Sequence, residues 1–480
     1  KPFGKSENLN PWGYYGIQLV CLVVVIPFCI FGMRGGIGAA VRPITVSNAN
    51  QYVNRPIETG LVLNTPFAMI RTIGKKPFVV PAYYKDEAAM EAVYTPVHTP
   101  ADSVQFRPLN VVVFIMESFG KEYIGALNKD LDGGAYKGYT PFLDSLISES
   151  LTFEYSFANG HKSIDGMPSV LSGIPMFVEP FFLTPASMNK VSGIGGELRK
   201  KGYYTAFFHG AENGSMGFEA FSRATGFQDY YGRTEYNNDD DFDGRWAIWD
   251  EEFFQFFADE LSSFRQPFAA ALFSASSHHP FVIPKRYTGK FPKGTLPIHQ
   301  CIGYSDYALK RFFEKASHES WFNNTLFVIT ADHTNQTEHP EYMTESGTFA
   351  VPVIFYQPGG TLKGHIDAIA QQIDIMPTVL GYLGYDKPYI SFGCDLLATP
   401  TSQTSAVNYI GGVYQYHKGR YLLQFDGKES VALYDFVSDR LLEHNLLGTL
   451  PEIQSSMESE LKAIIQQYMT RMNTDKLVCE

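Results

Sequence analysis

The sequence lacks the hallmarks of several protein classes. Its five cysteines are scattered over 480 residues, two of them inside one apolar segment, so they form no disulfide framework. Acidic residues outnumber basic ones by 50 to 38, and a net charge of -12 argues against a nucleic-acid-binding protein, which usually carries a basic stripe. There is no Gly-x-x-x-x-Gly-Lys-Ser/Thr phosphate loop and no repeat of fixed period. We therefore expect no nucleic-acid partner and no nucleoside-triphosphate chemistry.

Charge is absent from Asn8 to Met33, and the core of this stretch, Ile17 to Phe31, is almost entirely apolar. As a helix it is long enough to cross about 30 Å of hydrocarbon. A signal peptide is the alternative, but no clear small-residue cleavage site follows the apolar core, and the chain begins with Lys1 rather than Met. We expect a transmembrane helix, either alone or as the last of several. Two lysines precede it and two arginines follow, so the flanking charge does not orient it.

Four short apolar runs each end near a side chain that can bind a metal or move a proton. Such runs are typical of strands covered on both faces by helices. In open α/β sheets, chemistry collects at the carboxyl ends of the strands. Ordinary surface strand ends are the alternative, but four such ends, one with an Asp-His pair, indicate a metal site. The runs are Val111–Met116 before Glu117, Thr205–Phe208 before His209, Phe268–Phe273 before His278, and Leu326–Thr330 before Asp332 and His333.

The apolar runs alternate with helix-like segments, which predicts a mostly parallel α/β sheet flanked by helices. Shorter alternating runs near the C-terminus predict an antiparallel meander that turns at Lys418-Gly and Asp426-Gly, followed by an amphipathic helix from Ile453 to Met472. Prolines between residues 75 and 107 predict an extended lead-in. The predicted units are a transmembrane helix at 1–34, a juxtamembrane linker with short helices at 35–108, a catalytic α/β domain at 109–400, and a C-terminal antiparallel subdomain with a terminal helix at 401–480.

A candidate nucleophile follows the apolar segment Leu151–Phe157. Ser163 stands beside Lys162, just before a predicted helix start. Both the helix-end amides and the lysine would favour the serine alkoxide. The alternative is that Ser163 and Ser169 only cap helices. The residues alone leave both interpretations open.

The ordered set of motifs resembles the alkaline phosphatase superfamily and, within it, the sulfatase-like branch of lipoteichoic acid synthases and phosphoglycerol transferases. No single motif decides this, but their order along the chain does. The matching segments are Glu117 at a strand end, Lys162-Ser163 with Gly166-Met-Pro168 and Leu171-Ser-Gly173, Phe207-Phe-His-Gly210, Asp241–Asp250, Ser277-His-His-Pro-Phe281, Thr330-Ala-Asp-His-Thr334, Gln372-Ile-Asp-Ile-Met-Pro-Thr378 and Tyr434-Asp-Phe436.

The resemblance implies one divalent ion, with Mn²⁺ favoured over Mg²⁺ or Zn²⁺. Its ligands would be Glu117, Ser163, Asp332 and His333. Mixed oxygen and nitrogen ligands suit these ions, and metal binding lowers the pKa of a hydroxyl. The nucleophile in the synthases and in phosphoethanolamine transferases is threonine, whereas this chain has serine.

The resemblance also implies that His209 and His278 contact the phosphate or protonate a leaving alkoxide, with Lys162 as a further catalytic residue. Buried structural histidines are the alternative. His279 is expected at the rim, and His339 is a weaker candidate for the pocket. We expect Trp246 and Trp249 to be core or rim aromatics. The tryptophan and arginine that bind glycerophosphate in the synthases have no counterpart in the segment 213–218.

These observations predict a membrane-anchored transferase. A phosphoglycerol-type head group would pass from an anionic phospholipid to a glycan acceptor through a covalent Ser163 intermediate, on the periplasmic side of the cytoplasmic membrane. A sulfatase is disfavoured, because Ser163 is not followed by the Pro and Arg that formylglycine formation requires. The alternatives are a phosphoethanolamine transferase, a phosphodiesterase or phosphatase of the same superfamily, and a degenerate glycan- or lipid-binding module. The complete set of four ligands argues against degeneration.

Overall fold

The computed structural model describes residues 10–34, 48–49, 52–53, 58–73, 78–100 and 105–479. The chain forms two units, Lys1–Thr45 and Val46–Glu480. The lysines before the apolar segment and most of residues 35–57, the first part of the linker predicted at 35–108, lie outside the described residues. The domain boundaries at residues 34, 108 and 400 stay predictions.

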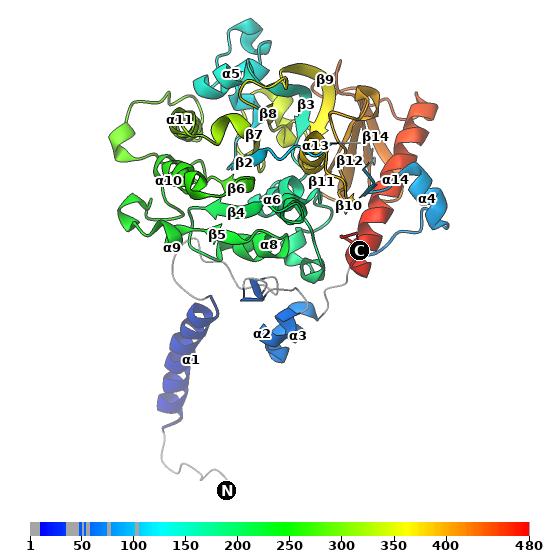
Figure 1. The fold of residues 1–480 in the computed structure, drawn as a ribbon. Coiled ribbons are helices and arrows are strands. Elements are labelled where there is room, and N and C mark those ends of the chain that lie inside the picture. Colours follow the sequence, from blue (N-terminus) through cyan, green and yellow to red (C-terminus); the bar gives the residue numbers. More distant parts are fainter. Residues whose placement is uncertain are drawn as a thin grey trace. The chain divides into compact units, whose positions relative to one another are not determined.

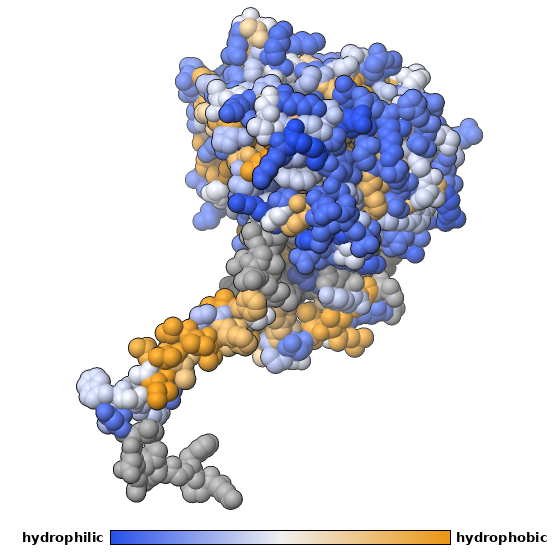
Figure 2. All heavy atoms as spheres, turned by 90° about the vertical axis from the view of Figure 1, so that its left-hand side faces the viewer, coloured by the Kyte–Doolittle hydropathy of each residue, from blue (hydrophilic) through white to orange (hydrophobic). Residues whose placement is uncertain are grey.

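The N-terminal unit contains one long helix, α1 (Pro11–Arg34). Its segment Pro11–Gly32, 22 residues, is long and apolar enough to cross a membrane, and its residues are exposed. Figure 2 shows this helix as a predominantly apolar surface. The apolar helix predicted from the sequence is therefore present.

The larger unit is built on an eight-stranded sheet with the order β5-β4-β6-β2-β7-β8-β3-β9. The five strands from β5 to β7 are parallel to one another, β3 and β9 are parallel to each other, and β8 runs antiparallel to both of its neighbours, β7 and β3. The predicted mostly parallel α/β sheet is confirmed. The strands are β2 (Asn110–Met116), β3 (Leu151–Phe157), β4 (Tyr204–His209), β5 (Asp229–Tyr231), β6 (Phe268–Phe273), β7 (Thr325–Ala331), β8 (Val353–Tyr356) and β9 (Gly364–Gln371).

Both faces of the sheet are covered, which explains why the central strands read as unbroken apolar runs. In β2, Val111 and Val113 enter one core while Val112 and Phe114 enter the other. Figure 1 shows α10 and α11 on one side of the sheet and α6 and α13 on the other. The covering helices are α5 (Pro141–Ile147), α10 (Asp250–Ser263) and α11 (His299–Ala316) on the first side, and α6 (Ser163–Ser172), α7 (Ile194–Arg199) and α13 (Ile375–Leu383) on the second.

The C-terminal region forms a separate antiparallel sheet with the order β11-β12-β13-β14, and a terminal helix follows it. This confirms the predicted meander and helix. One expectation was wrong: the proline-rich lead-in contains the helix α4 (Glu87–Val93), because Asp86 caps a run of strong helix formers that packs against α14. The strands are β11 (Ser405–Ile410), β12 (Val413–Lys418), β13 (Tyr421–Phe425) and β14 (Ser430–Asp435), and the helix is α14 (Pro451–Thr474).

The remaining described helices and strands are short. β1 and β10 pair with each other in a two-stranded sheet. These elements are α2 (Thr59–Val62), α3 (Thr65–Thr72), β1 (Val97–His98), α8 (Phe218–Ala224), α9 (Arg233–Tyr236), α12 (Pro340–Met343) and β10 (Tyr389–Ile390).

Candidate active site and metal centre

Two neighbouring parallel strands, β2 and β7, carry the acidic residues of the candidate centre. Met116 and Ala331 are paired across the ladder, so Glu117 and Asp332 leave the sheet side by side. One possible ligand atom each from Glu117, Asp332 and His333 lies within 4.8 Å of the others, and all three residues are buried. His333 Nε2 is 3.1 Å from Asp332 Oδ2 and 3.8 Å from Glu117 Oε1. We call these three residues the strand-end cluster.

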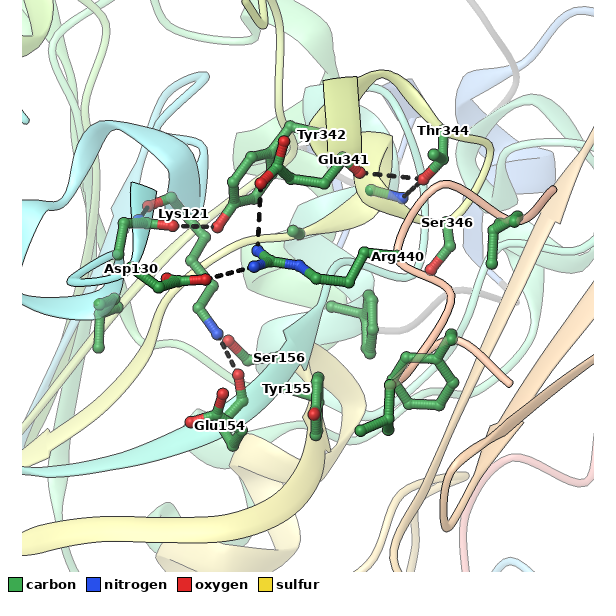
Figure 3. Close-up of a pocket in the computed structure, with 18 residues that line it drawn as sticks. Lys121, Asp130, Glu154, Tyr155, Ser156, Glu341, Tyr342, Thr344, Ser346 and Arg440 are labelled. Atoms are coloured by element: carbon green, nitrogen blue, oxygen red, sulfur yellow. Dashed lines mark hydrogen bonds and ion pairs between the residues drawn. The ribbon is translucent and has the colours of Figure 1, made fainter. Parts of the chain in front are cut away.

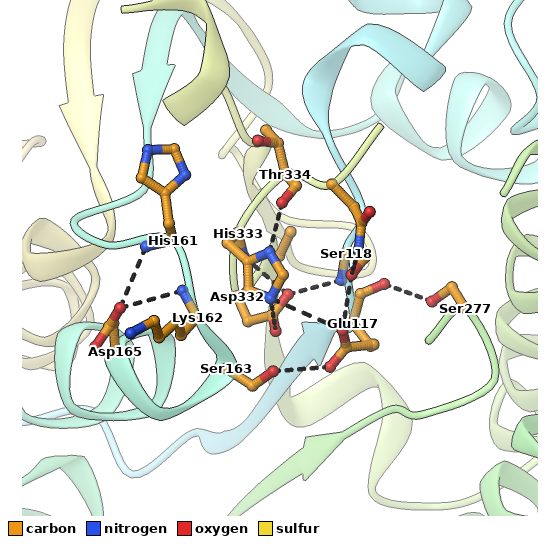
Figure 4. Close-up of polar contacts among 12 residues, drawn as sticks. Glu117, Ser118, His161, Lys162, Ser163, Asp165, Ser277, Asp332, His333 and Thr334 are labelled. Carbon is orange, nitrogen blue, oxygen red and sulfur yellow. Dashed lines mark hydrogen bonds and ion pairs between the residues drawn. The ribbon is translucent and has the colours of Figure 1, made fainter. Parts of the chain in front are cut away.

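Ser163 reaches the strand-end cluster from the first turn of α6 (Figure 4). Its hydroxyl donates to Glu117 Oε2 over 3.1 Å, and the residue is only 8% exposed. The Asp165 carboxylate accepts the backbone N–H groups of His161 and Lys162, which fixes the loop that enters the helix. The four residues predicted as metal ligands are thus brought together, with the hydroxyl at a helix N-terminus, where an alkoxide is electrostatically favoured.

The protonation equilibria of the strand-end cluster are shifted by burial and by mutual charge. Burial and the neighbouring Asp332 raise the pKa of Glu117. Burial opposes ionisation of Asp332, but His333 outweighs it and lowers the pKa of this carboxyl. Burial likewise opposes protonation of His333, but Asp332 outweighs it and raises the imidazole pKa to about 10. Two carboxylates in so little solvent need positive charge, which a divalent cation would supply.

A strained turn directly after Glu117 aligns the ligands. Ser118 has a φ of 56°, a left-handed value that few residues other than glycine adopt. In this conformation its N–H donates to Asp332 Oδ1 over 2.7 Å, and its hydroxyl donates to Glu117 Oε1 over 2.7 Å. Asp332 Oδ1 also accepts the N–H of His333, whereas Oδ2 accepts no hydrogen bond from the described residues. This buried oxygen, which faces His333 Nε2 but accepts no hydrogen bond, fits a metal ligand.

Gln372, the first residue of the segment 372–378, connects two parts of the site. The Gln372 amide donates to the carbonyl oxygens of Ala331 and Asp332, over 2.6 and 2.7 Å. Its own oxygen accepts the N–H of Asn159 over 2.9 Å. One buried glutamine therefore ties the end of β7 to the loop that delivers the serine.

Gly166 allows α6 to approach the Asp332 backbone closely. A Cβ atom at this position would lie 2.7 Å from Asp332 Cα and 2.8 Å from its carbonyl oxygen. Any larger residue would therefore push the helix, and Ser163 with it, away from the strand-end cluster.

His209 and His278 lie at the same end of the sheet. His209, at the end of β4, is bonded through Nδ1 to the carbonyl of Phe273 over 3.0 Å, and its Nε2 is buried without a described partner. Burial lowers its pKa to about 4. His278 is half-buried against the Trp246 ring, with centroids 4.3 Å apart, and burial also lowers its pKa. Asp332 acts on both imidazoles electrostatically.

Three further residues named from the sequence form no hydrogen bond or ion pair with the strand-end cluster among the described residues. The Lys162 side chain is exposed and points away from the Ser163 hydroxyl in Figure 4, so its catalytic role stays a prediction. The Trp246 indole donates to the His279 carbonyl at the rim. His339 is bonded to Glu122, over 2.6 Å.

Sequence reasoning overlooked His161. Its ring packs on Phe349 with centroids 3.8 Å apart, and burial together with the charge of His333 lowers its pKa to about 4. The only signal in the sequence was its position two residues before Ser163.

The segment 213–218, which the family resemblance aligns with the glycerophosphate-binding residues, is a tight turn. Gly214 and Gly217 have φ values of 80° and 76°. Phe218, which begins α8, packs on the His209 ring with centroids 5.1 Å apart. An apolar side chain therefore closes this side of the site.

A cavity of about 310 Å³ lies apart from the strand-end cluster and includes none of its residues. Figure 3 shows its charged lining: Arg440 bridges Asp130 and Glu341, and the buried Lys121 amine donates to the carbonyl of Glu154. Burial lowers the pKa of Lys121 to about 8.

Comparison with known proteins identifies a family model and several relatives of this chain. The Sulfatase family model matches residues 109–385. Lipoteichoic acid synthase 1 of Bacillus subtilis is 24% identical over 327 residues, 62% of this chain and 49% of the synthase. Phosphoglycerol transferase I of Citrobacter koseri is 27% identical over 274 residues, 53% of this chain and 33% of that protein.

A solved alkaline phosphatase superfamily protein of Vibrio parahaemolyticus superposes with a TM-score of 0.71 at 24% identity, covering 83% of this chain and 98% of its own. The expected alkaline-phosphatase-like fold is therefore present. This chain spans about half the length of the synthases it matches, 49%, 52% and 51% for three of them.

Proposed function

Because this chain belongs to the Sulfatase family, and its curated relatives include lipoteichoic acid synthases and a phosphoglycerol transferase, we propose that it is a membrane-anchored, metal-dependent phosphoglycerol transferase. The observation that carries the proposal is the Ser163 hydroxyl, buried at the start of α6 and bonded to Glu117 beside Asp332 and His333. A serine that merely caps a helix would bond to the N–H groups of its own first turn. Ser163 is instead the first residue of α6, and its hydroxyl donates to Glu117, while Asp165 accepts the N–H of Lys162, the residue before the helix.

The reaction proceeds in two balanced steps. Ser163 Oγ loses its proton to solvent and attacks the phosphorus of the phospholipid head group, a phosphoserine ester bond forms, and the bond to the diacylglycerol oxygen breaks. The leaving oxygen takes a proton, for which the half-buried His278 is the proposed donor. In the second step an acceptor hydroxyl attacks the same phosphorus and gives its proton to His278, the phosphorus–serine bond breaks, and the serine oxygen takes a proton from solvent. His209, deeper in the site, would contact the phosphate.

The residues present fit one divalent cation. Glu117, Ser163, Asp332 and His333 would hold it, and the buried Asp332 Oδ2 with no hydrogen bond supports this. When bound, the ion lowers the pKa of the serine hydroxyl and screens the phosphate charge. Mn²⁺ is favoured among the ions that accept mixed oxygen and nitrogen ligands, with Mg²⁺ and Zn²⁺ as alternatives.

A lipid donor is supported by the apolar helix α1, which would hold the site near the membrane where such a donor resides. The donor would be an anionic phospholipid and the acceptor an extracytoplasmic glycan, with the catalytic domain on the periplasmic side. Because the phosphodiester supplies the free energy, no ATP is required. Protease treatment of intact spheroplasts should cleave the domain, and full protection would contradict this location.

One observation favours a second candidate, a phosphoethanolamine transferase. The segment 213–218 lacks the tryptophan and arginine that the resemblance implies for glycerophosphate binding, and Phe218 closes that side of the site. A different head group would leave the serine chemistry unchanged.

The decisive assay measures diacylglycerol release by the full chain in phospholipid vesicles. We expect release from phosphatidylglycerol that needs no ATP and stops when the divalent ion is chelated. Release only from phosphatidylethanolamine would favour the second candidate. Release that continues in the presence of a strong chelator, or that requires ATP, would contradict both.

A further inference from the structure

A second group of acidic and histidine side chains lies on loops that continue from the strand-end cluster. Glu122 belongs to the short 3-10 helix η3 (Lys121–Tyr123), five residues beyond Glu117. Glu338 and His339 directly precede α12, beyond His333. One possible ligand atom from each of the three lies within 4.8 Å of the others. We call these three residues the loop cluster.

Glu122 is the buried centre of the loop cluster and is only 1% exposed. Its Oε1 accepts the backbone N–H groups of Glu338 and His339, over 3.0 and 2.8 Å, and lies 2.6 Å from His339 Nδ1. Its other oxygen, Oε2, is buried and has no hydrogen-bond partner among the described residues. Leaving a buried carboxylate oxygen unpaired costs free energy, so its position indicates a ligand.

The charge around Glu122 is predominantly negative. Asp132 Oδ1 lies 3.5 Å from His339 Nε2, so three carboxylates share one imidazole. In the part of the chain that the structure describes, no lysine or arginine forms an ion pair with Glu122, Glu338 or Asp132. Burial, together with Glu338, Glu122 and Asp132, raises the pKa of the adjacent Tyr139 to about 12. A cation would offset this excess.

The two clusters share one local arrangement. In the strand-end cluster, Asp332 Oδ1 accepts two backbone N–H groups and Oδ2 accepts none. In the loop cluster, Glu122 Oε1 accepts two backbone N–H groups and Oε2 accepts none. Each carboxylate is thus held by the main chain, and its second oxygen is left for another partner.

We propose that Glu122, Glu338 and His339 bind a second divalent cation, of the class that accepts both carboxylate oxygen and imidazole nitrogen, such as Zn²⁺ or Mn²⁺. The ion would join η3 to the loop 334–339. Glu117 precedes the first of these segments and His333 precedes the second, so the ion would stiffen the support of the catalytic centre. The proposal of this site does not rest on the proposed transferase activity. Without the ion, a protonated His339 paired with Glu122 is the competing account.

Metal counting on the full chain tests this proposal. The protein is stripped with a chelator, equilibrated with Zn²⁺ or Mn²⁺ and freed of unbound ion, and its metal content is measured by mass spectrometry. The wild type should bind two ions per chain, Asp332→Asn one, His339→Ala one, and the double variant none. Glu338→Gln should behave like His339→Ala.

His365→Ala is the matched control, because His365 pairs with Glu154 on the surface without a third ligand. It should keep two ions. If Asp332→Asn binds no ion, or if His339→Ala keeps the wild-type content, the loop cluster is an ion pair and the proposal is overturned. A wild type with one ion that Asp332→Asn keeps and His339→Ala loses would support this site while removing the proposed catalytic metal.

Discussion

The strand-end cluster and the loop cluster contain similar side chains but differ in burial and in their neighbouring groups. Both centre on a buried carboxylate fixed by two backbone N–H groups, with a histidine beside it. The strand-end cluster is buried and follows two paired strands, whereas Glu338 and His339 are partly exposed on loops. Only the strand-end cluster has a hydroxyl at the start of a helix. We therefore propose catalysis for the strand-end cluster, where a nucleophile is added, and a structural cross-link for the loop cluster, where none is.

The strongest test of this difference removes the nucleophile. Ser163→Ala should lower turnover by more than about 10³-fold, because the attacking atom is lost. The fold should remain intact, as judged by circular dichroism, since one hydroxyl contributes little stability. Ser163→Thr serves as the control and should keep measurable activity. Near-normal turnover by the alanine variant would assign the attack to another group.

A smaller loss should follow from changing the proposed proton donor. His278→Gln should reduce turnover by about 10²-fold, the lower end of what a positioned general acid contributes. The matched control is His279→Gln, which changes the exposed neighbour and should leave the rate within about twofold, since a surface substitution perturbs little. Equal losses in the two variants would indicate a structural effect of the loop instead. Steady-state kinetics with phosphatidylglycerol vesicles measures both.

The close approach of α6 to β7 should also be measurable. Gly166→Ala places a methyl group 2.7 Å from Asp332 Cα, so unfolding free energy should fall by about 2 to 3 kcal/mol through overpacking. Activity should fall as well, since the serine moves with the helix. Gly60→Ala is the control, because a Cβ there meets nothing within 4 Å. Chemical denaturation of both variants gives the comparison, and an unchanged midpoint for Gly166→Ala would contradict the tight packing described.

The buried carboxyl of Asp306, which has no histidine among its described partners, allows the effect of burial on a carboxyl pKa to be measured separately from that of a histidine. Asp306 accepts the N–H groups of Phe142 and Leu143, each over 2.9 Å, and burial raises its pKa to about 7 against the opposing effect of these two hydrogen bonds. A carboxyl whose pKa is raised on folding contributes stability that is full below its unfolded pKa, near 4, and is lost as pH rises through about 7.

Wild-type stability should therefore fall from about pH 4 to about pH 7, by roughly 1 kcal/mol per pH unit from this residue, and Asp306→Asn should remove that part of the slope. Urea denaturation at several pH values gives the measurement. An identical slope in the variant would show that Asp306 ionises normally in the folded protein.

The strand-end cluster could be predicted from the sequence because its residues directly follow strands that the sequence marks as apolar runs. Apolar runs such as Val111–Met116 indicate strands buried on both faces, and parallel neighbours bring Glu117 and Asp332 together without further information. The antiparallel strand β8 was not predicted, because four residues give too short a periodic signal. The helix α4 was obscured by the prolines around it.

The supports of the site depend on distant contacts that no local pattern encodes. Gln372 reaches the end of β7, about 40 positions away in the chain, and its role becomes visible only in the folded sheet. The left-handed backbone of Ser118 has no sequence signature, since serine does not favour that conformation. The loop cluster joins Glu122 to residues more than 200 positions later, so the earlier expectation for His339 gave no hint of its partner.

The central claim is that Ser163 carries the transferred group, and peptide mass spectrometry tests it most directly. The full chain is incubated with phosphatidylglycerol in the presence of Mn²⁺ and without a glycan acceptor, quenched in acid and digested. We expect the peptide containing Ser163 to carry the mass of one phosphoglycerol group, and the Ser163→Ala chain to carry none. A wild-type chain that releases diacylglycerol while the added mass appears on a different residue would contradict the account.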